Sequence, residues 1–287
     1  MKYAFIQEHR FEFTIVMMAR VLGVSCSGFY AWTKRLVGCA AVEARAVFDA
    51  RVREVFEQHK GRYGAPRVAV ELHDAGTQAN RKTVAASLHR QGLKARAARK
   101  FKVTTNSEHD LAVAPNLLKQ DFHADMPNQK WVADITYLPT DEGWLYLAVV
   151  LDLYSRRVVG WAMDKRMKTG LVCGALNMAL HQREQPTGVI VHSDRGSQYC
   201  SHAYQRIINT QQLKCSMSRR GDCYDNSCAE SFFHTLKVEL THGVRYETRA
   251  QLRHEVFEFI EAYYNTNRRH STLGFISPVD FEALKVA

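Results

Sequence analysis

WVADITYL, residues 131–138, has the composition of a core β-strand. It is rich in residues that favour β-strands, and it carries one carboxylate, Asp134, at its centre. An ionised side chain in a core strand is costly unless a cation or hydrogen bonds compensate for its burial. We therefore expect other segments of the chain to bring partners to Asp134.

Two later segments offer such partners. The first is GVIVHSD, residues 188–194, an apolar run that ends in Asp194. This pattern predicts a buried strand with a carboxylate at its C-terminal end, where open α/β sheets place their ligands. The second, residues 225–240, has the apolar periodicity of a helix, with Asp225 or Asn226 as its N-cap. A polar stripe along this helix consists of Asn226, Glu230, His234 and Lys237.

The spacing of these acids is specific. Asp194 and Glu230 are separated by 35 residues, and the order strand, strand, helix resembles the D, D, 35, E pattern of the ribonuclease-H-like polynucleotidyl transferases. That group includes retroviral integrases and many bacterial transposases. The wording around the acids, NQKW at 128–131, HSDRG at 192–196 and ESFF at 230–233, resembles the OrfB proteins of two-frame bacterial insertion sequences, the IS-three family. This resemblance covers nearly the whole chain.

The resemblance implies the fold class. It implies an α/β fold in which a ribonuclease-H-like mixed sheet is flanked by helices and preceded by small all-α, helix-turn-helix-like modules. The first and fourth strands lie side by side in such a sheet, which would bring Asp134 and Asp194 together. Residue patterns predict strands at 131–138, 144–151, 157–163, 189–194 and 215–218, and helices at 171–181 and 204–210.

The resemblance also implies a catalytic site. Asp134, Asp194 and Glu230 would be catalytic and would hold two Mg²⁺ ions, with Mn²⁺ as a substitute. Two divalent ions activate the attacking oxygen and stabilise the leaving oxygen in phosphodiester transfer, and Mg²⁺ prefers carboxylate oxygens. Lys237 and Asn226 would contact DNA.

Several residues near this site have two interpretations. Lys237 is either a DNA contact or an ordinary surface lysine. His192, two residues before Asp194, either helps to orient the metal ligands without binding the metal, or is a core histidine with its own hydrogen bonds. Asp152 follows an apolar run and is either a metal ligand or a residue that caps a turn.

Charge divides the chain into two parts. Residues 1–120 hold 20 Lys and Arg against 10 Asp and Glu, whereas residues 121–287 hold 19 of each. The whole formal excess of +10 therefore lies in the amino-terminal part. This distribution predicts a basic part that binds a polyanion and a neutral part that performs metal-dependent chemistry on it.

The basic part predicts two helical modules. Residues 1–42 form a helix-turn-helix-like segment with a turn at Gly23, an N-cap at Ser25 and a second helix at 27–34, although a purely structural hairpin has the same pattern. Residues 43–102 form a second DNA-binding module with a basic tail. Its predicted elements are helices at 43–60, 66–75 and 81–90, a turn at Gly76 and an N-cap at Asn80. Its expected phosphate contacts are Arg81, Lys82, Arg96, Arg99 and Lys100.

The remaining boundaries follow from the periodicity. Residues 103–127 lack it and predict a linker, and residues 128–287 form the catalytic core with a C-terminal helix at 248–264. Arg268 and Arg269 lie in a basic segment after this helix, which either reaches DNA or caps the sheet.

Composition excludes other classes of protein. No apolar run approaches the roughly 20 residues of a membrane span, and the amino terminus lacks a signal-peptide pattern, so we expect a cytoplasmic protein without a membrane partner. The seven cysteines form no CxxC pair. The His-His-Cys-Cys module of retroviral integrases is absent, which fits the insertion-sequence comparison.

The sequence therefore predicts a DNA transposase catalytic subunit. By resemblance, it would cleave and transfer DNA strands at insertion-sequence ends, join an OrfA moiety by frameshift fusion, and act as a homo-oligomer on DNA. Two alternatives remain open, a non-catalytic DNA-binding regulator of transposition and a ribonuclease-H-like nuclease.

Overall fold

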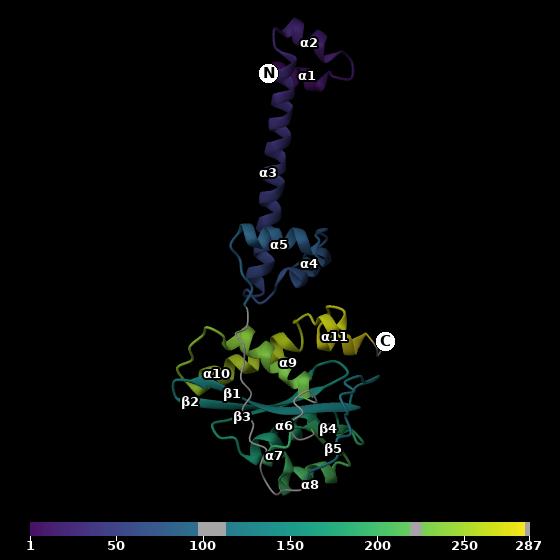
Figure 1. Ribbon diagram of the computed structural model, residues 1–287, viewed down its shortest axis with the longest axis vertical. Helices are drawn as coiled ribbons and strands as arrows, with labels where there is room; N and C mark the ends of the chain where they lie inside the picture. The colour runs from purple at the N-terminus through teal and green to yellow at the C-terminus, as the bar shows by residue number, and fades with distance from the viewer. Residues whose placement is uncertain (97–112, 219–225, 285–287) are drawn as a thin grey trace. The chain divides into compact units, whose positions relative to one another are not determined.

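The structure is a computed structural model that describes residues 1–96, 113–218 and 226–284, without the side chains of residues 37–40. The chain divides into two compact units, Met1–Ala95 and Arg96–Ala287 (Figure 1). Each is described by itself.

The first unit is helical. Its helices are α1 (Lys2–Glu8), α2 (Ile15–Leu22), α3 (Cys26–Gln58), α4 (Ala65–Asp74) and α5 (Arg81–Arg90). Gly23 ends α2 in the left-handed conformation, with φ of 63°, and the Ser25 side chain accepts a hydrogen bond from the Gly28 amide. Both the predicted turn and the predicted N-cap are therefore confirmed.

Helix α3 differs from the prediction. The helices expected at 27–34 and 43–60 are a single helix of 33 residues, which crosses the predicted module boundary at residue 42. The intervening residues RLVGCAAV, 35–42, contain one glycine and no proline. A single glycine costs only about 1 kcal/mol in a helix, so nothing in this segment stops α3.

Helices α4 and α5 match their predictions. Gly76 has φ of 78° in the turn between them. The Asn80 side chain then accepts a hydrogen bond of 2.9 Å from the Thr83 amide and caps α5. Both helices also pack on α3, because each buries apolar side chains: Val68 and Leu72 on α4, Val84 and Leu88 on α5.

The second unit contains a five-stranded mixed sheet. Its strands are β1 (Lys130–Thr140), β2 (Gly143–Asp152), β3 (Val158–Asp164), β4 (Ile190–Ser193) and β5 (Lys214–Met217). Their order is β3-β2-β1-β4-β5, in which β1 pairs antiparallel with β2 and parallel with β4. The predicted strands are confirmed, and so is the neighbouring position of the first and fourth.

Helices cover both faces of this sheet (Figure 1). One face packs against α6 (Thr169–Gln182), α7 (Ser197–Cys200) and α8 (His202–Thr210). The opposite face packs against α9 (Ser227–Leu236), η2 (Lys237–Thr241), α10 (Arg249–Phe257) and η3 (Glu258–Tyr264). The alternation of β1 causes this arrangement, because Trp131 and Ala133 join the α6 core whereas Val132 and Leu138 join the α9 core.

The C-terminal elements complete the α9 face. The predicted helix at 248–264 consists of α10 followed without a break by η3, a π-helical segment, and the Thr248 side chain caps it. The chain then forms η4 (Ser271–Leu273) and α11 (Pro278–Ala283).

Part of the expected linker belongs to the sheet. Pro115 accepts a hydrogen bond of 3.4 Å from the Met217 amide, and the Ser216 hydroxyl accepts one of 2.8 Å from the Leu117 amide. Leu118 is buried in the core. Residues 113–118 thus cover the outer edge of β5, and such contacts carry no periodic signal in the sequence. Residues 103–112 lie outside the described part of the chain.

Candidate active site and nucleic-acid interface

Asp134 lies on the central strand β1, and Asp194 directly follows the C-terminal end of the neighbouring strand β4. In the parallel ladder of β1 with β4, Val132 is opposite His192, and continuing that register by two residues places Asp194 level with Asp134. Strand β4 ends at Ser193, so β1 continues past its neighbour at this point. The sequence therefore brings the two carboxylates to adjacent positions where the sheet opens.

Backbone amides hold both carboxylates. Asp134 Oδ1 accepts a hydrogen bond of 2.7 Å from the Ile135 amide, and Asp194 Oδ1 accepts one of 2.9 Å from the Gly196 amide. A Cβ atom at Gly196 would lie 3.0 Å from that Asp194 oxygen. A residue without a side chain thus suits the turn that orients Asp194.

Glu230 comes from helix α9, which covers one face of the sheet. It lies in the first turn of α9, is exposed, and precedes the buried pair Phe232 and Phe233 that fixes this helix on the sheet. Partial burial of its carboxyl group raises the pKa of Glu230.

The three carboxylates influence one another. Burial, the charge of Asp194 and then the charge of Glu230 all raise the pKa of Asp134 well above its usual range. Hydrogen bonding to the Ile135 amide and the nearby Lys237 oppose this shift. Burial and the two neighbouring carboxylates together therefore disfavour the ionised form of Asp134.

Lys237 supplies one cation. It is the first residue of η2, is half-buried, and places its Nζ atom 5.1 Å from the centre of the Tyr137 ring. Burial lowers the pKa of Lys237 to about 8, and the charge of Asp134 opposes that shift. The predicted site lysine thus lies beside the first carboxylate.

The donor set fits a hard divalent cation. Among the described residues, no group of three or more His, Cys, Asp and Glu side chains is close enough to hold a metal. However, Mg²⁺ is usually held by one or two carboxylates and completes its shell with water and substrate phosphates. Asp134 and Asp194, level on adjacent strands and repelling each other, match that requirement.

His192 and Asn226 are both buried. The His192 Nδ1 atom lies 2.8 Å from the Ser216 hydroxyl, and its Nε2 atom lies 3.1 Å from the Ser218 hydroxyl. Asn226 occupies the N-cap position of α9 without a side-chain cap hydrogen bond. Within the described parts of the chain, its Oδ1 atom has no hydrogen-bond partner.

Asp152 caps a turn. It is fully buried, and its carboxylate accepts hydrogen bonds from the Asn128 amide at 2.9 Å and the Tyr154 amide at 3.0 Å. Arg183 lies 3.6 Å away. The turn-capping interpretation is therefore confirmed.

Comparison with known proteins identifies the family. Integrase core domain families match residues 124–223 and 230–285, and a helix-turn-helix-like domain family matches residues 43–101. The transposase InsF of insertion sequence IS3A from Escherichia coli K12 is 53% identical over 288 residues, which cover 100% of both chains. The chain belongs to the insertion-sequence transposases.

A second insertion-sequence transposase agrees with this membership. The transposase of insertion sequence element IS904 from Lactococcus lactis is 45% identical over 239 residues, 83% of this chain and 94% of its own. Among solved structures, the HTLV-2 integrase catalytic core domain in complex with magnesium is 15% identical, with a TM-score of 0.44 over 56% of this chain and 99% of its own. The transposase is a polynucleotidyl transferase of the DDE type, and DNA is its substrate.

The basic residues of the amino-terminal part that are expected to contact DNA lie in different surroundings in the transposase. Arg81 and Lys82 are the first two residues of α5, and both are exposed. Arg96 is also exposed, but its Nη1 atom donates a hydrogen bond of 2.9 Å to the Glu239 carbonyl. Arg99 and Lys100 lie outside the described residues.

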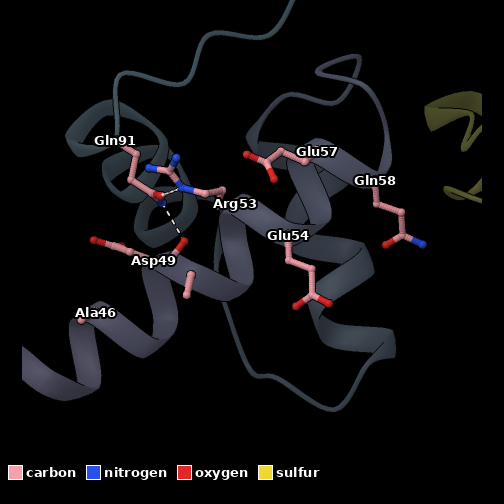
Figure 2. A pocket seen from close by; sticks show the side chains of 8 residues that line it. Ala46, Asp49, Arg53, Glu54, Glu57, Gln58 and Gln91 are labelled. Atoms are coloured by element: carbon pink, nitrogen blue, oxygen red, sulfur yellow. Dashed lines mark hydrogen bonds between the residues drawn. The ribbon is translucent and has the colours of Figure 1, made fainter.

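A groove in the helical module is lined partly by acidic residues and does not suit DNA. It has a volume of about 790 Å³ and lies along α3 (Figure 2). Arg53 donates a hydrogen bond to Gln91, whose side chain donates to the Asp49 carbonyl. Glu54 and Glu57 also line the groove, and their negative charges would repel phosphates.

The basic C-terminal segment of the transposase caps the sheet. The Asn265 side chain donates to the Val158 carbonyl at 3.0 Å and accepts from the Val158 amide at 2.9 Å, so it pairs with edge strand β3 as another strand would. Arg268 is only 6% exposed and is paired with Glu239. Of the two interpretations for this segment, capping of the sheet is confirmed at Asn265, whereas Arg268 is paired with Glu239 of η2.

The sequence did not predict the pairing of Glu239 with Arg268. Arg268 Nη2 lies 2.8 Å and Nε 3.0 Å from the Glu239 carboxylate, and the Tyr263 hydroxyl donates to it at 3.3 Å. The only available signal was an acid, Glu239, within an otherwise apolar helical pattern. This pair anchors η2, the turn in which Lys237 is the first residue.

No single helix among the described residues is long and apolar enough to cross a membrane. Helices α2 and α3, which are bent relative to each other, have the length and composition of a membrane span only when they are taken together.

Proposed function

We propose that Asp134, Asp194 and Glu230 are the catalytic carboxylates of this transposase. The observation that carries the proposal is the level position of Asp134 and Asp194 on adjacent parallel strands, together with the burial and the repulsion from Asp194 that raise the pKa of Asp134. A cluster of acids that disfavours its own ionisation is typical of a site that gains stability when cations bind.

These residues would hold two divalent ions, Mg²⁺ with Mn²⁺ as a substitute. When bound, such ions supply a lower pKa for the attacking oxygen and charge neutralisation for the leaving oxygen. Asp134 and Asp194 would provide oxygen ligands from the sheet, and Glu230 would provide one from α9. His192 would keep the β4 end rigid through its contacts with Ser216 and Ser218.

Two phosphoryl transfers would follow at this site. In the first, a water oxygen attacks the phosphorus at the element end, the P–O3′ bond breaks, and the end is released with a free 3′-hydroxyl. In the second, that hydroxyl attacks a target phosphodiester, a new P–O bond forms, and the target 3′-oxygen leaves. Lys237, beside Asp134, would bind a phosphate of the element end and hold it against the carboxylates.

The helical modules would select the DNA. We assign residues 1–42 and 43–102 to DNA binding, with α5 as the helix that enters the groove, because Arg81 and Lys82 are exposed at its N-terminus. Arg96, Arg99 and Lys100 would add phosphate contacts, and Asn226 would contact the end once α9 has engaged it. By resemblance to OrfB proteins, an OrfA moiety joined by frameshift fusion and a second copy of the chain would complete the assembly on DNA.

A product assay tests this proposal. The purified chain is incubated with Mg²⁺ or Mn²⁺, a labelled duplex that carries the terminal repeats flanking this frame, and a supercoiled target plasmid. We expect labelled end joined to plasmid, and none with EDTA. Cleavage without joining would support a nuclease instead, and binding without either reaction, also in the OrfA fusion, would support a regulator.

A further inference from the structure

We propose that residues 165–168, the loop Lys-Arg-Met-Lys between β3 and α6, bind the phosphate backbone of the target DNA. We call this segment the basic loop. The inference rests on the proposed function, and it assigns to the second DNA substrate a surface on the catalytic unit.

The basic loop carries cations with no acidic partner. Lys165, Arg166 and Lys168 are all exposed, and within the described residues none of them forms a salt bridge. Six other Lys and Arg residues of the catalytic unit do have an acidic partner among the described residues. Those in ion pairs with Asp or Glu are Lys130, Arg157, Arg183, Arg245, Arg249 and Arg268. Because residues 121–287 are neutral overall, three unpaired cations within four residues form a local positive patch.

Hydrogen bonds fix the backbone of the loop. Asp164 Oδ1 accepts one of 3.1 Å from the Arg166 amide, and the Lys168 amide donates to the Arg166 carbonyl at 3.0 Å. The Leu171 amide then donates to the Lys168 carbonyl at 3.0 Å and starts α6. The three cations thus project from a turn that is held at both ends, which reduces the entropy cost of binding a ligand.

Gln198 links the loop to the catalytic carboxylates. Its Nε2 atom donates a hydrogen bond of 3.2 Å to the Met167 carbonyl. Its Oε1 atom lies 3.0 Å from where a Cβ of Gly196 would be, and the Gly196 amide binds Asp194. Asp194 Oδ1 lies 3.0 Å from the same Cβ position, so Gln198 joins the basic loop to the turn that holds Asp194, and a duplex lying over the carboxylates can reach the loop.

The sheet faces distinguish the two DNA substrates. Lys237, which we assign to the element end, comes from η2 on the α9 face. The basic loop leads into α6 and is bonded to α7, and both helices cover the opposite face. Strand transfer requires two duplexes at the same carboxylates, and they cannot occupy the same space. If the element end approaches over Lys237, the target approaches over the basic loop.

Charge-removing variants test the inference. The triple variant Lys165→Gln, Arg166→Gln, Lys168→Gln is compared with the scattered variant Lys119→Gln, Arg206→Gln, Lys214→Gln, in which three exposed cations of the same unit come from three separate segments of the chain. The probe is a 30-bp duplex without terminal repeats, and its affinity for the full chain is measured over a range of salt concentrations. Each phosphate contact contributes about 0.9 to the slope of the logarithm of the binding constant against the logarithm of the salt concentration. We therefore expect the loop variant to reduce the magnitude of this slope by about 2 to 3, and the scattered variant to reduce it by less than about 1.

A strand-transfer assay distinguishes binding of the target DNA from binding of the element end. With pre-cleaved element ends, we expect the loop variant to lower joining to plasmid at least about tenfold at 150 mM salt, while affinity for the terminal-repeat duplex falls no more than in the scattered variant. Equal losses of salt slope in both triple variants would overturn the inference, and so would a loss of affinity confined to the terminal repeats. If the wild type joins no DNA, the proposed function fails, yet the salt slopes still decide the role of the loop.

Discussion

Replacing Asp134 with asparagine is expected to abolish strand transfer and to stabilise the fold at neutral pH. Asparagine keeps the shape of the side chain but removes the charge that would bind the cations, so we expect joining to fall at least about 10³-fold. The same change relieves the repulsion from Asp194 and Glu230. Opposite effects on activity and stability are typical of residues kept for function.

The pH dependence of stability provides the measurement. Because the pKa of Asp134 is raised in the folded protein, the folded state binds more protons than the unfolded state above pH of about 4. The stability that protonated Asp134 contributes is therefore lost as the pH rises through the folded pKa. In urea titrations with EDTA, the excess free energy of unfolding of Asp134→Asn over wild type should grow from pH 4 to pH 8. A difference that shrinks over this range, or a variant less stable at pH 8, would contradict the account.

The single variant Arg268→Met is expected to cost about 3–5 kcal/mol of unfolding free energy. Arg268 is 6% exposed and Glu239 is 5% exposed, and they form three hydrogen bonds of 2.8–3.1 Å. Methionine fills a similar volume but removes the positive charge and these three hydrogen bonds from the buried Glu239 carboxylate. A buried carboxylate that has lost its charge partner explains the size of the loss.

A second variant distinguishes charge from packing. Arg268→Met combined with Glu239→Leu removes both charges, and such replacements of a buried pair are often neutral or stabilising. We expect the double variant to recover most of the loss when both are measured by urea denaturation at pH 7. A double variant as unstable as the single one would show that packing of the guanidinium, and not its charge, holds η2.

The sequence predicted the elements whose causes are local. Strand β1 and helix α9 were identified because their apolar residues repeat with the strand and helix periods. Asn80 and Ser25 marked helix starts because a short polar side chain satisfies the first free amides. The candidate carboxylates followed from their spacing along the chain and from their elements: Asp134 lies within β1, Asp194 directly follows β4, and Glu230 lies in the first turn of α9.

The remaining features depend on contacts between distant residues. Nothing near residues 35–42 showed whether α3 would continue, because one glycine is compatible with either outcome. Residues 113–118 have no regular pattern, and only the open edge of β5 explains their position. Likewise, the charge of Arg268 alone indicated a DNA contact. Only the folded structure shows that Arg268 is paired with Glu239, 29 residues earlier in the chain.

If Asp134, Asp194 and Glu230 catalyse strand transfer, neutralising Glu230 must abolish joining. Pre-cleaved terminal-repeat ends, plasmid and Mg²⁺ are incubated with wild type, with Glu230→Gln and with Glu258→Gln. Glu258 is an exposed acid of the same unit, so its variant controls for loss of one charge. The account predicts joined product for wild type and Glu258→Gln, and a loss of at least about 10³-fold for Glu230→Gln, with all three proteins equally folded and binding the ends. Normal joining by Glu230→Gln would contradict it.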